Sequence, residues 1–348
     1  MSPARPVSCR CVLLLLLPLV VSGCAGEKPS WVDRNQQVID EHKITGRTRD
    51  LPSVSVPTVL ADGEPVERAR LPVITIAPGV TATLGWGRGA LVERVDMQAN
   101  ATYPAQTLNE ELFIIVQDGS ATIDVGGKTA DLTKDHAVYL QPGVVRSMTA
   151  GANGMRAFEI YSPVRLDHLA MAGQSTAGVS ATFPDQGVTP SLQPGVVVDL
   201  NDIQWTPLTD PVPGRGYRRS TTHSRLLWGR NAQISLVRID PQSEIALHIH
   251  PEDQLTTTVR GTIEQGVMDR TYPESGTAGH ILFLPGGICT RAKRAMWAWI
   301  SSMSSGPCGR IMSSAPGSNR RSTNRSLRRE QRRRNWLRGS RSPRGRRG

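Results

Sequence analysis

The sequence has few cysteines, no long apolar run and no sustained helical pattern. Of its five cysteines, three lie within the first 24 residues, which leaves Cys289 and Cys308 for the rest of the chain. Two such residues provide neither a disulfide framework nor the spacing of a zinc ribbon. The apolar run at residues 12–17 is too short to span a bilayer comfortably. These absences exclude a disulfide scaffold and a zinc-ribbon protein.

The first residues have the organisation of an export signal. Arg5 and Arg10 precede the apolar run, and small residues close it directly before Cys24. This ending resembles a bacterial lipoprotein signal, which implies cleavage before Cys24 and lipidation of its thiol. A plain signal peptide with a chance cysteine is the alternative. We expect an exported protein, periplasmic or at the cell surface, that is held to the membrane by its lipid anchor only.

Acidic residues are nearly absent from the last part of the chain. Residues 291–348 hold sixteen arginines and one lysine against a single acid, Glu330, which gives a net charge of +16. The rest of the chain carries −5 of the total of +11. The basic character therefore belongs to this tail alone.

One interpretation of the tail is a nucleic-acid-binding arm at residues 320–348, since basic runs attract phosphates. An exported lipoprotein meets little nucleic acid, and the arm has one aromatic residue, Trp336, for stacking on bases. We therefore expect no nucleic-acid partner.

Short apolar runs separated by Gly, Pro and Asp fill the middle of the chain, which indicates an all-β fold. The pattern occurs twice: WGRGA at 86–90 returns as WGRNA at 228–232, and AVYLQPG at 137–143 returns as ILFLPG at 281–286. Two copies of about a hundred residues each predict a pair of small sandwiches or barrels. The expected divisions are a signal peptide at 1–23, a lead-in with the first strands at 24–80, an N-terminal barrel at 81–172, a linker at 173–196, a C-terminal barrel at 197–290 and a basic tail at 291–348.

The stretch HIHPEDQLTTTVRG concentrates two of the seven histidines in three residues. Alternate side chains of a strand share a face, so His248 and His250 point one way and Ile249 the other. Gln254 lies an even number of residues further on and can return to the same face, and Gly261 ends the run in a turn. Two imidazoles and an amide oxygen on one inward face can bind a divalent cation.

These residues resemble the first motif of the cupin family, a His-x-His pair, an acid or glutamine four residues later, and a glycine after six more. The second motif of that family ends in Pro-x-Gly-x-x-His, and residues 285–290 match it until the last position, which is Thr290. The resemblance covers about residues 81–163 and 201–290. It implies two double-stranded β-helix (jelly-roll) barrels, the second with a metal site in its mouth.

The implied metal ligands are His248, His250 and Gln254, with the third histidine of the family absent because the chain has Thr290. Such a set suits iron, manganese, nickel, zinc or copper alike, so we expect one divalent transition metal of open identity. Glu252 and Asp253 lie between two of the ligands, and we interpret both as solvated loop carboxylates.

The first half has no imidazole pair at the equivalent positions, so we expect its barrel to bind no metal and to offer a surface to a partner. Arg146 lies near the place of the third ligand. His136 and His280 precede matching strands, and we assign them a capping or core role. Two registers of the repeat are open: one places Pro104, Gln106 and Glu110 at the ligand positions, and the other places Gln106, Leu108 and Leu112 there.

Residues 296–300 can form a strand, but Ser, Arg and Gly without apolar period follow, so the second barrel has no evident end. A one-base shift of the reading frame joins the last base of each codon to the first two bases of the next. With GC-rich codons, residues 294–312 then read GDVGVDILDVLWPVRPDY. This resembles MRAFEIYSPVRLDHL at residues 155–169 and shares its P-V-R-x-D pattern. Cys289-Thr290 can encode the missing histidine in the same frame. We infer one frameshift between about Pro285 and Thr290, an error or a real mutation, which leaves the second barrel incomplete.

Two functions remain open. The first is an exported, lipid-anchored protein of two cupin barrels that binds one metal and acts on a small sugar acid or another carboxylate, as an isomerase, lyase or dioxygenase. This follows from the resemblance, since its ligand set is similar to that of cupins that ketonise unsaturated uronates. The second is a non-catalytic binding or scaffold protein whose metal site is vestigial, which a genuine Thr290 favours. Both take a small-molecule ligand, and assembly into a homo-oligomer stays open.

Overall fold

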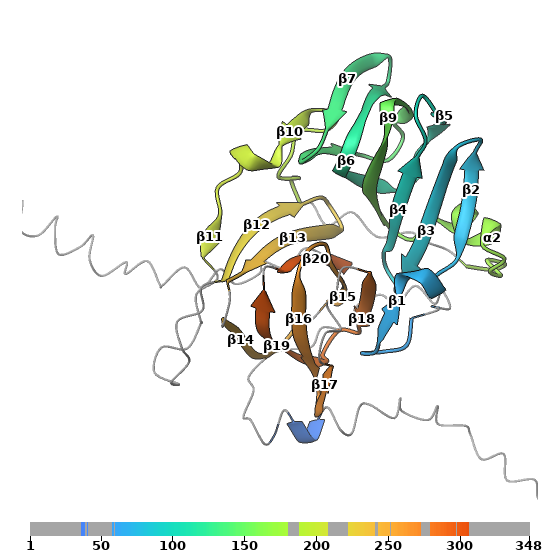
Figure 1. Cartoon of the computed structure of the whole chain (residues 1–348). Helices are drawn as coiled ribbons and strands as arrows, with labels where there is room; N and C mark the ends of the chain where they lie inside the picture. Colours follow the sequence, from blue (N-terminus) through green and yellow to red (C-terminus); the bar gives the residue numbers. More distant parts are fainter. Residues whose placement is uncertain are drawn as a thin grey trace, which may run out of the picture.

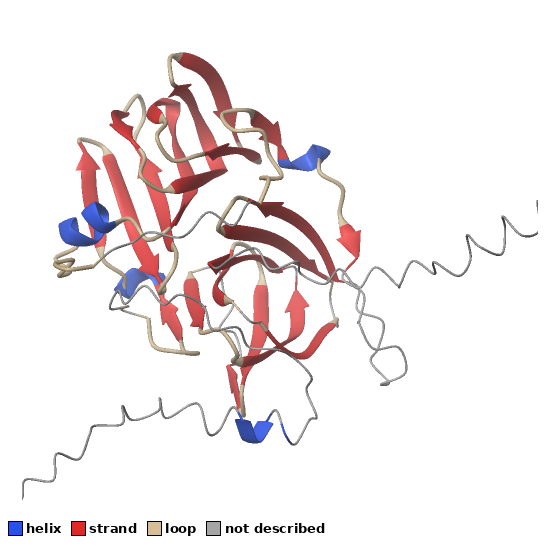
Figure 2. Ribbon diagram, turned by 180° about the vertical axis from the view of Figure 1, so that it is seen from behind, coloured by secondary structure: helices blue, strands red, loops and turns tan. Residues whose placement is uncertain are grey.

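The computed structural model describes residues 36–38, 40, 58, 60–179, 188–207, 222–240, 243–250, 252–272, 279–296 and 298–305. These residues form an almost entirely β structure with short peripheral helices (Figure 2). None of the helices in these ranges has the length and apolar character needed to cross a bilayer. The expected signal peptide at 1–23, the lipidation site Cys24 and residues 306–348 of the tail lie outside the described residues.

The first barrel contains strands in the order β10-β8-β6-β9-β4-β3-β2, with β5 beside β9 and β7 beside β6 (Figure 1). Two long strands, β6 (Glu111–Val125) and β9 (Val145–Ser162), pair with each other along most of their length and tie the barrel together. A short helix, α2 (Leu166–Met171), follows β9. The other strands are β2 (Val73–Ala77), β3 (Val80–Trp86), β4 (Leu91–Met97), β5 (Thr102–Thr107), β7 (Lys128–Thr133), β8 (His136–Leu140) and β10 (Val197–Asp199).

The second barrel repeats this plan with its long strands divided. One sheet has the order β1-β18-β15-β20-β13-β12-β11, and a smaller sheet has the order β14-β19-β16-β17. The strands are β1 (Pro65–Glu67), β11 (Thr206–Pro207), β12 (Thr222–Trp228), β13 (Ala232–Ile239), β14 (Glu244–Ile249), β15 (Asp253–Thr258), β16 (Thr262–Val267), β17 (Arg270–Tyr272), β18 (His280–Leu284), β19 (Cys289–Met296) and β20 (Ala298–Ser305).

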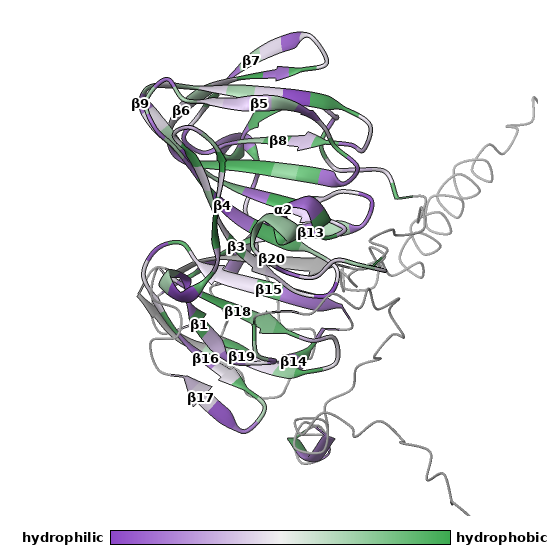
Figure 3. Ribbon diagram, turned by 90° about the vertical axis from the view of Figure 1, so that its right-hand side faces the viewer, coloured by the Kyte–Doolittle hydropathy of each residue, from purple (hydrophilic) through white to green (hydrophobic). Residues whose placement is uncertain are grey.

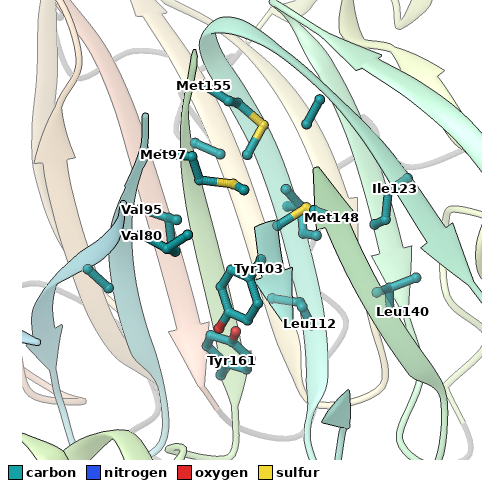
Figure 4. Close-up of a cluster of buried hydrophobic side chains, with 14 of the residues drawn as sticks. Val80, Val95, Met97, Tyr103, Leu112, Ile123, Leu140, Met148, Met155 and Tyr161 are labelled. Carbon is teal, nitrogen blue, oxygen red and sulfur yellow. The ribbon is translucent and has the colours of Figure 1, made fainter. Parts of the chain in front are cut away.

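The core of the first barrel follows from the two-residue period of its strands. In β3, for example, Val80, Ala82, Leu84 and Trp86 are fully buried, while the residues between the first three of them keep some exposure. Figure 4 shows aliphatic and methionine side chains that fill this interior, together with two tyrosines whose hydroxyl groups lie near each other. The apolar filling makes the first barrel a packed body rather than an open channel.

The two barrels exchange strands at their junction. β1, which precedes the first barrel in the chain, pairs with β18 of the second. β10, which precedes the second barrel, pairs with β8 of the first. Each exchanged strand runs into a single turn of 3-10 helix, η1 (Arg68–Arg70) or η2 (Leu200–Asp202). The exchange is reciprocal, so each barrel supplies one edge strand of the other, and Figure 3 shows the barrels stacked on one another.

Strand register settles which residues of the two barrels are equivalent. Leu112 pairs with Leu140, and Gln254 pairs with Leu284. Because Leu140 and Leu284 end the repeated segments AVYL and ILFL, Leu112 is the equivalent of Gln254. The register that places Gln106, Leu108 and Leu112 at the ligand positions is therefore correct, and the one that uses Pro104 and Glu110 is wrong.

One buried acid from each barrel locks it to the other. Glu111 of the first barrel accepts hydrogen bonds from the backbone N–H groups of Arg230, Asn231 and Ala232, at 2.7–2.9 Å. Burial raises the pKa of Glu111, and these N–H groups oppose the shift. These contacts link strand ends that lie more than a hundred residues apart in the chain.

Asp253, the equivalent of Glu111, makes the reciprocal lock. Its carboxylate accepts two hydrogen bonds from Arg88, at 3.0 and 2.5 Å, and one from the backbone N–H of Gly286 at 2.9 Å. Only 6% of Asp253 and 7% of Glu252 are exposed, so the interpretation of these two residues as solvated loop carboxylates is wrong. A lone carboxylate is costly to bury, and the guanidinium of Arg88 compensates for it.

The stretch after residue 290 differs from the expectation of an incomplete barrel. Residues up to Met296 extend β19, which pairs with β14 and β16. β20 lies between β13 and β15 and closes the larger sheet. Strand pairing is made by backbone groups, so a segment without an apolar pattern can still complete a sheet. The basic tail assigned to residues 291–348 thus gives its first part to the second barrel.

Candidate metal centre

Two histidines lie side by side at the end of β14. His248 is on this strand, and His250 follows directly after its last residue, Ile249. The Nε2 atoms of the two rings are 3.0 Å apart, and the ring centroids are 4.7 Å apart at an interplanar angle of 80°. Ile249 packs on the other side, against the cluster that contains Cys289. The strand alternation expected from the sequence therefore brings both imidazoles to one face.

The separation of the two nitrogens suits one metal ion. Imidazole nitrogens bond zinc at about 2.0–2.1 Å, so two nitrogens at adjacent coordination positions lie about 2.9–3.4 Å apart. The observed 3.0 Å falls within this range. A hydrogen bond in which one Nε2–H donates to the other ring gives the same distance without a metal. The pair can thus pass from a hydrogen bond to metal ligation with little movement of the rings.

Thr290 occupies the place of the third ligand but is engaged elsewhere. It lies opposite His248 in the pairing of β14 with β19 and is 2% exposed. Its hydroxyl donates to the carbonyl oxygen of Gly266 at 3.1 Å and accepts a hydrogen bond from the amide of Gln265. In the described part of the chain, no three His, Cys, Asp or Glu side chains gather as a metal site. The residues thus fit a metal through two imidazoles and lack the third nitrogen of the cupin set.

Gln254 lies on the other sheet of the barrel. It lies on β15, opposite Leu284 of β18, and is 9% exposed. Its neighbour Leu255 packs into the core between the barrels, so strand alternation turns Gln254 toward the interior of the second barrel. An amide oxygen at this position is an acceptable donor to a divalent ion.

The electrostatics of the pair keep His250 neutral. Burial and, to a smaller extent, the neighbouring His248 lower the pKa of His250 from 6.5 to about 3. The ring then keeps a free nitrogen lone pair at neutral pH, which is the form that binds metals.

This shift predicts a pH dependence of stability in the metal-free protein. The unfolded chain protonates His250 below about pH 6.5, whereas the folded chain resists protonation until about pH 3. Unfolding therefore takes up a proton, and its free energy falls as the pH drops below 6.5, by at most about 1.4 kcal/mol per unit. Urea unfolding in EDTA at pH 7.5 and 5.0 should show a drop that His250→Gln reduces by up to about 2 kcal/mol. An unchanged drop in the variant would show that His250 titrates normally.

The first barrel has no imidazole at the equivalent positions. Gln106 lies opposite Arg146, as His248 lies opposite Thr290. Leu108 takes the place of His250, and its 1% exposure marks it as a core residue. An arginine thus stands in the first barrel where the cupin motif has its third ligand.

Arg146 is the centre of a buried ionic network. Its guanidinium donates two hydrogen bonds to Glu159, at 3.0 and 2.6 Å, and one to the hydroxyl of Tyr161 at 2.8 Å. It also stacks on Tyr103, 3.9 Å from the ring centroid, and all four side chains are fully buried. Burial alone would lower the pKa of Arg146, but Glu159 and the two tyrosines raise it above its ordinary value. Arg146 is therefore a permanent positive charge inside the barrel.

Residues directly before and within α2 complete the network. Arg165 donates hydrogen bonds to Gln106 and to both oxygens of Asp167. His168 pairs with Glu93 through Nδ1 and Oε1 at 2.5 Å. Burial raises the pKa of Glu93, and the hydrogen bond from His168 opposes that shift. The buried polar residues of this barrel thus neutralise one another.

Two acidic residues at core-facing strand positions already indicate this network in the sequence. Glu93 lies at a core-facing position of β4, between Leu91 and Val95, and Glu159 faces it from β9. A charged residue at an inward position of an alternating strand indicates a buried ion pair. His136, by contrast, accepts a hydrogen bond from the backbone N–H of Thr133 at 3.3 Å, in agreement with the expected capping role.

Comparison with known proteins supports the fold alone. No family model and no curated protein matches the chain. Protein Ylba from E. coli aligns with a TM-score of 0.52 and 14% identity over 72% of this chain and 95% of its own. Oxalate decarboxylase from Lactobacillus farciminis, in a formate complex, aligns with a TM-score of 0.50 and 13% identity over 76% and 89%. The structure is thus similar to those of cupin-family proteins, and the predicted pair of jelly-roll barrels is confirmed.

Proposed function

We propose that the chain is an exported, lipid-anchored cupin-fold protein that binds one divalent transition metal in its second barrel. His248, His250 and Gln254 would hold the ion, and water would complete its coordination. The 3.0 Å approach of the two Nε2 atoms carries the proposal, because it matches the spacing of nitrogens on one ion. A metal held there supplies Lewis-acid polarisation of a ligand oxygen. The ligand class that we propose is a small sugar acid or another carboxylate.

Residues of this chain prepare the site in two ways. The lowered pKa of His250 keeps its lone pair available at neutral pH. The hydrogen bonds of Asp253 to Arg88 and Gly286 fix the start of β15 next to Gln254, which positions that amide. A rigid support of this kind reduces the cost of assembling ligands around an ion.

Metal titration tests the proposal directly. The metal-free protein should bind one equivalent of Zn²⁺ or Mn²⁺ in isothermal titration calorimetry. His248→Ala and His250→Ala should each weaken this binding by about 100-fold, since each removes one of two nitrogen ligands. His136→Ala is the matched control, because His136 caps a turn in the first barrel and should leave the affinity unchanged. Equal binding by His248→Ala would contradict the assignment.

The alternative is a non-catalytic binding protein with a vestigial site, and the engagement of Thr290 with Gln265 and Gly266 favours it. Incubation of the metal-loaded protein with a panel of uronates and dicarboxylates, followed by NMR, separates the two functions. Turnover that EDTA and His250→Ala abolish supports an enzyme. Ligand binding without turnover supports the binding protein.

A further inference from the structure

A cavity of about 350 Å³ opens at the seam between the two barrels. Both barrels line it: Ile115 and Phe158 come from the first, Leu236 from the second, and Leu200 from η2 between them. Cavities of this size at the boundary of two domains are frequent sites for small molecules. Neither His248 nor His250 lines it, so it is separate from the candidate metal centre.

The floor of the seam cavity is apolar. Ile115, Phe158, Leu200 and Leu236 all belong to the apolar core that joins the barrels. Each of these side chains is 2–7% exposed, so the core keeps some accessible apolar surface where the cavity meets it. Removing such surface from water is favourable by roughly 25 cal/mol per Å². The floor therefore suits the apolar body of a ligand.

The rim of the cavity carries two cations, one from each barrel. Lys134 and Arg260 are both exposed, and neither forms an ion pair within the described residues. Each precedes a residue of left-handed conformation, Asp135 with φ 67° or Gly261 with φ 86°. The backbone N–H of Asp135 donates to the carbonyl oxygen of Val116 at 3.0 Å, which fixes this turn over the cavity. The rim thus offers positive charge on two turns, one from each barrel.

Asp135, the acid of the lining, forms no ion pair with Lys134 or Arg260 within the described residues. Its charge acts on Arg225, whose pKa is lowered by burial and partly restored by Asp135 and Asp199. Arg225 stacks on Trp205, 4.2 Å from the ring. Lys134 and Arg260 therefore keep their charge available to a ligand.

The repeat provides a natural comparison at the equivalent place between the barrels. A groove of about 450 Å³ lies there, lined in part by Arg68 and Arg94. By strand register these arginines are the equivalents of Leu200 and Leu236. Arg68 stacks over Phe158 and donates a hydrogen bond to Thr257. The two equivalent places therefore differ in their lining: one has two leucines where the other has two arginines, and only the first has an apolar floor.

We propose that the seam cavity with the apolar floor binds a small amphipathic carboxylate, whose apolar body lies on Ile115, Phe158 and Leu236. Its carboxylate is held by Lys134 and Arg260 at the rim. This ligand touches both barrels, so its binding also stabilises their association.

A pair of probes that differ only in charge tests the proposal. 4-Phenylbutyrate has an apolar body and a carboxylate, and 4-phenyl-1-butanol has the same body without the charge. Isothermal titration of the full chain should show one equivalent of the acid bound, with the alcohol at least tenfold weaker. The Lys134→Ala/Arg260→Ala double variant should weaken the acid at least tenfold and leave the alcohol unchanged. Lys128→Ala, an exposed lysine on β7 outside the lining, should change neither.

Further measurements separate this site from the metal centre. Val259→Trp places a large ring at the half-buried edge of the cavity and should abolish binding of both probes. EDTA and His248→Ala should leave the acid affinity unchanged. The proposal is overturned if neither probe binds, if the acid and the alcohol bind equally, or if the double variant binds the acid normally. Loss of acid binding in EDTA overturns it as well, since the acid would then sit at the histidine pair.

Discussion

Replacement of Glu159 by glutamine is expected to lower the free energy of unfolding of the protein by about 3–5 kcal/mol. The change keeps the shape of the side chain and removes its charge. Arg146 then remains as a fully buried cation without its bidentate partner, because Tyr161 and Tyr103 offer only neutral groups. An uncompensated charge inside a barrel is among the costliest single changes in a folded protein.

The measurement is urea unfolding, followed by hydrogen exchange in peptides that cover β9. A double variant, Arg146→Met/Glu159→Leu, removes both charges and should recover most of the loss, since apolar residues of similar volume often replace a buried ion pair without cost. Asp96→Asn breaks the partly exposed pairs with Arg94 and Arg156 and should cost less than about 1 kcal/mol. If Glu159→Gln is as mild as Asp96→Asn, Arg146 is not a buried permanent charge.

Features that repeat in the sequence could be predicted. The echo of WGRGA in WGRNA marked two equivalent hairpins, β3 with β4 and β12 with β13. The echo of AVYL in ILFL marked two equivalent strands, β8 and β18. The placement of His248 and His250 on one face also followed from strand alternation alone. Strand alternation and the internal repeat were therefore enough to predict the fold class and the placement of the two histidines on one face.

Features that depend on distant partners could not be predicted. β1 pairs with β18 across more than two hundred residues, and no local pattern in Pro65–Glu67 indicates which strand it will join. Asp253 looked like a loop acid because its partner, Arg88, lies in the other barrel. Residues 296–300 indicated a possible strand, but the later residues of β20 have little apolar pattern, and the strand forms because its backbone groups pair with β13 and β15. Long-range pairing is decided by the assembled barrels rather than by the segment itself.

The exchange of strands and the paired acids have a common consequence. Glu111 holds a turn of the second barrel, and its equivalent Asp253 holds an arginine of the first. Each acid keeps one partner in its own barrel, Tyr139 for Glu111 and Gly286 for Asp253, but most of its hydrogen bonds come from the other barrel. Neither barrel can therefore fully satisfy its own acid when separated, and we expect the pair to unfold together rather than as independent domains.

Thr290→His is expected to tighten divalent metal binding by about 100-fold, because it adds a third imidazole to the pair. Position 290 lies directly opposite His248 in the strand register, and opposed residues share a face of the sheet. The substitution also releases Gln265 and the carbonyl of Gly266 from Thr290, so some loss of stability accompanies it. Calorimetric titration with Zn²⁺ or Mn²⁺ compares the variant with the parent chain, and Thr290→Leu controls for the larger side chain.

The outcome also bears on the reading frame of the gene. A one-base shift near residues 285–290 would encode a histidine at this point, and sequencing of the codons for residues 285–312 tests the shift itself. A missing or additional base, together with tighter binding in Thr290→His, would identify the parent chain as a disabled form of a three-histidine site. An unbroken frame, with no gain over Thr290→Leu, would instead make the histidine pair vestigial. The seam cavity would then be the stronger candidate for the function of the protein, because its lining does not involve position 290.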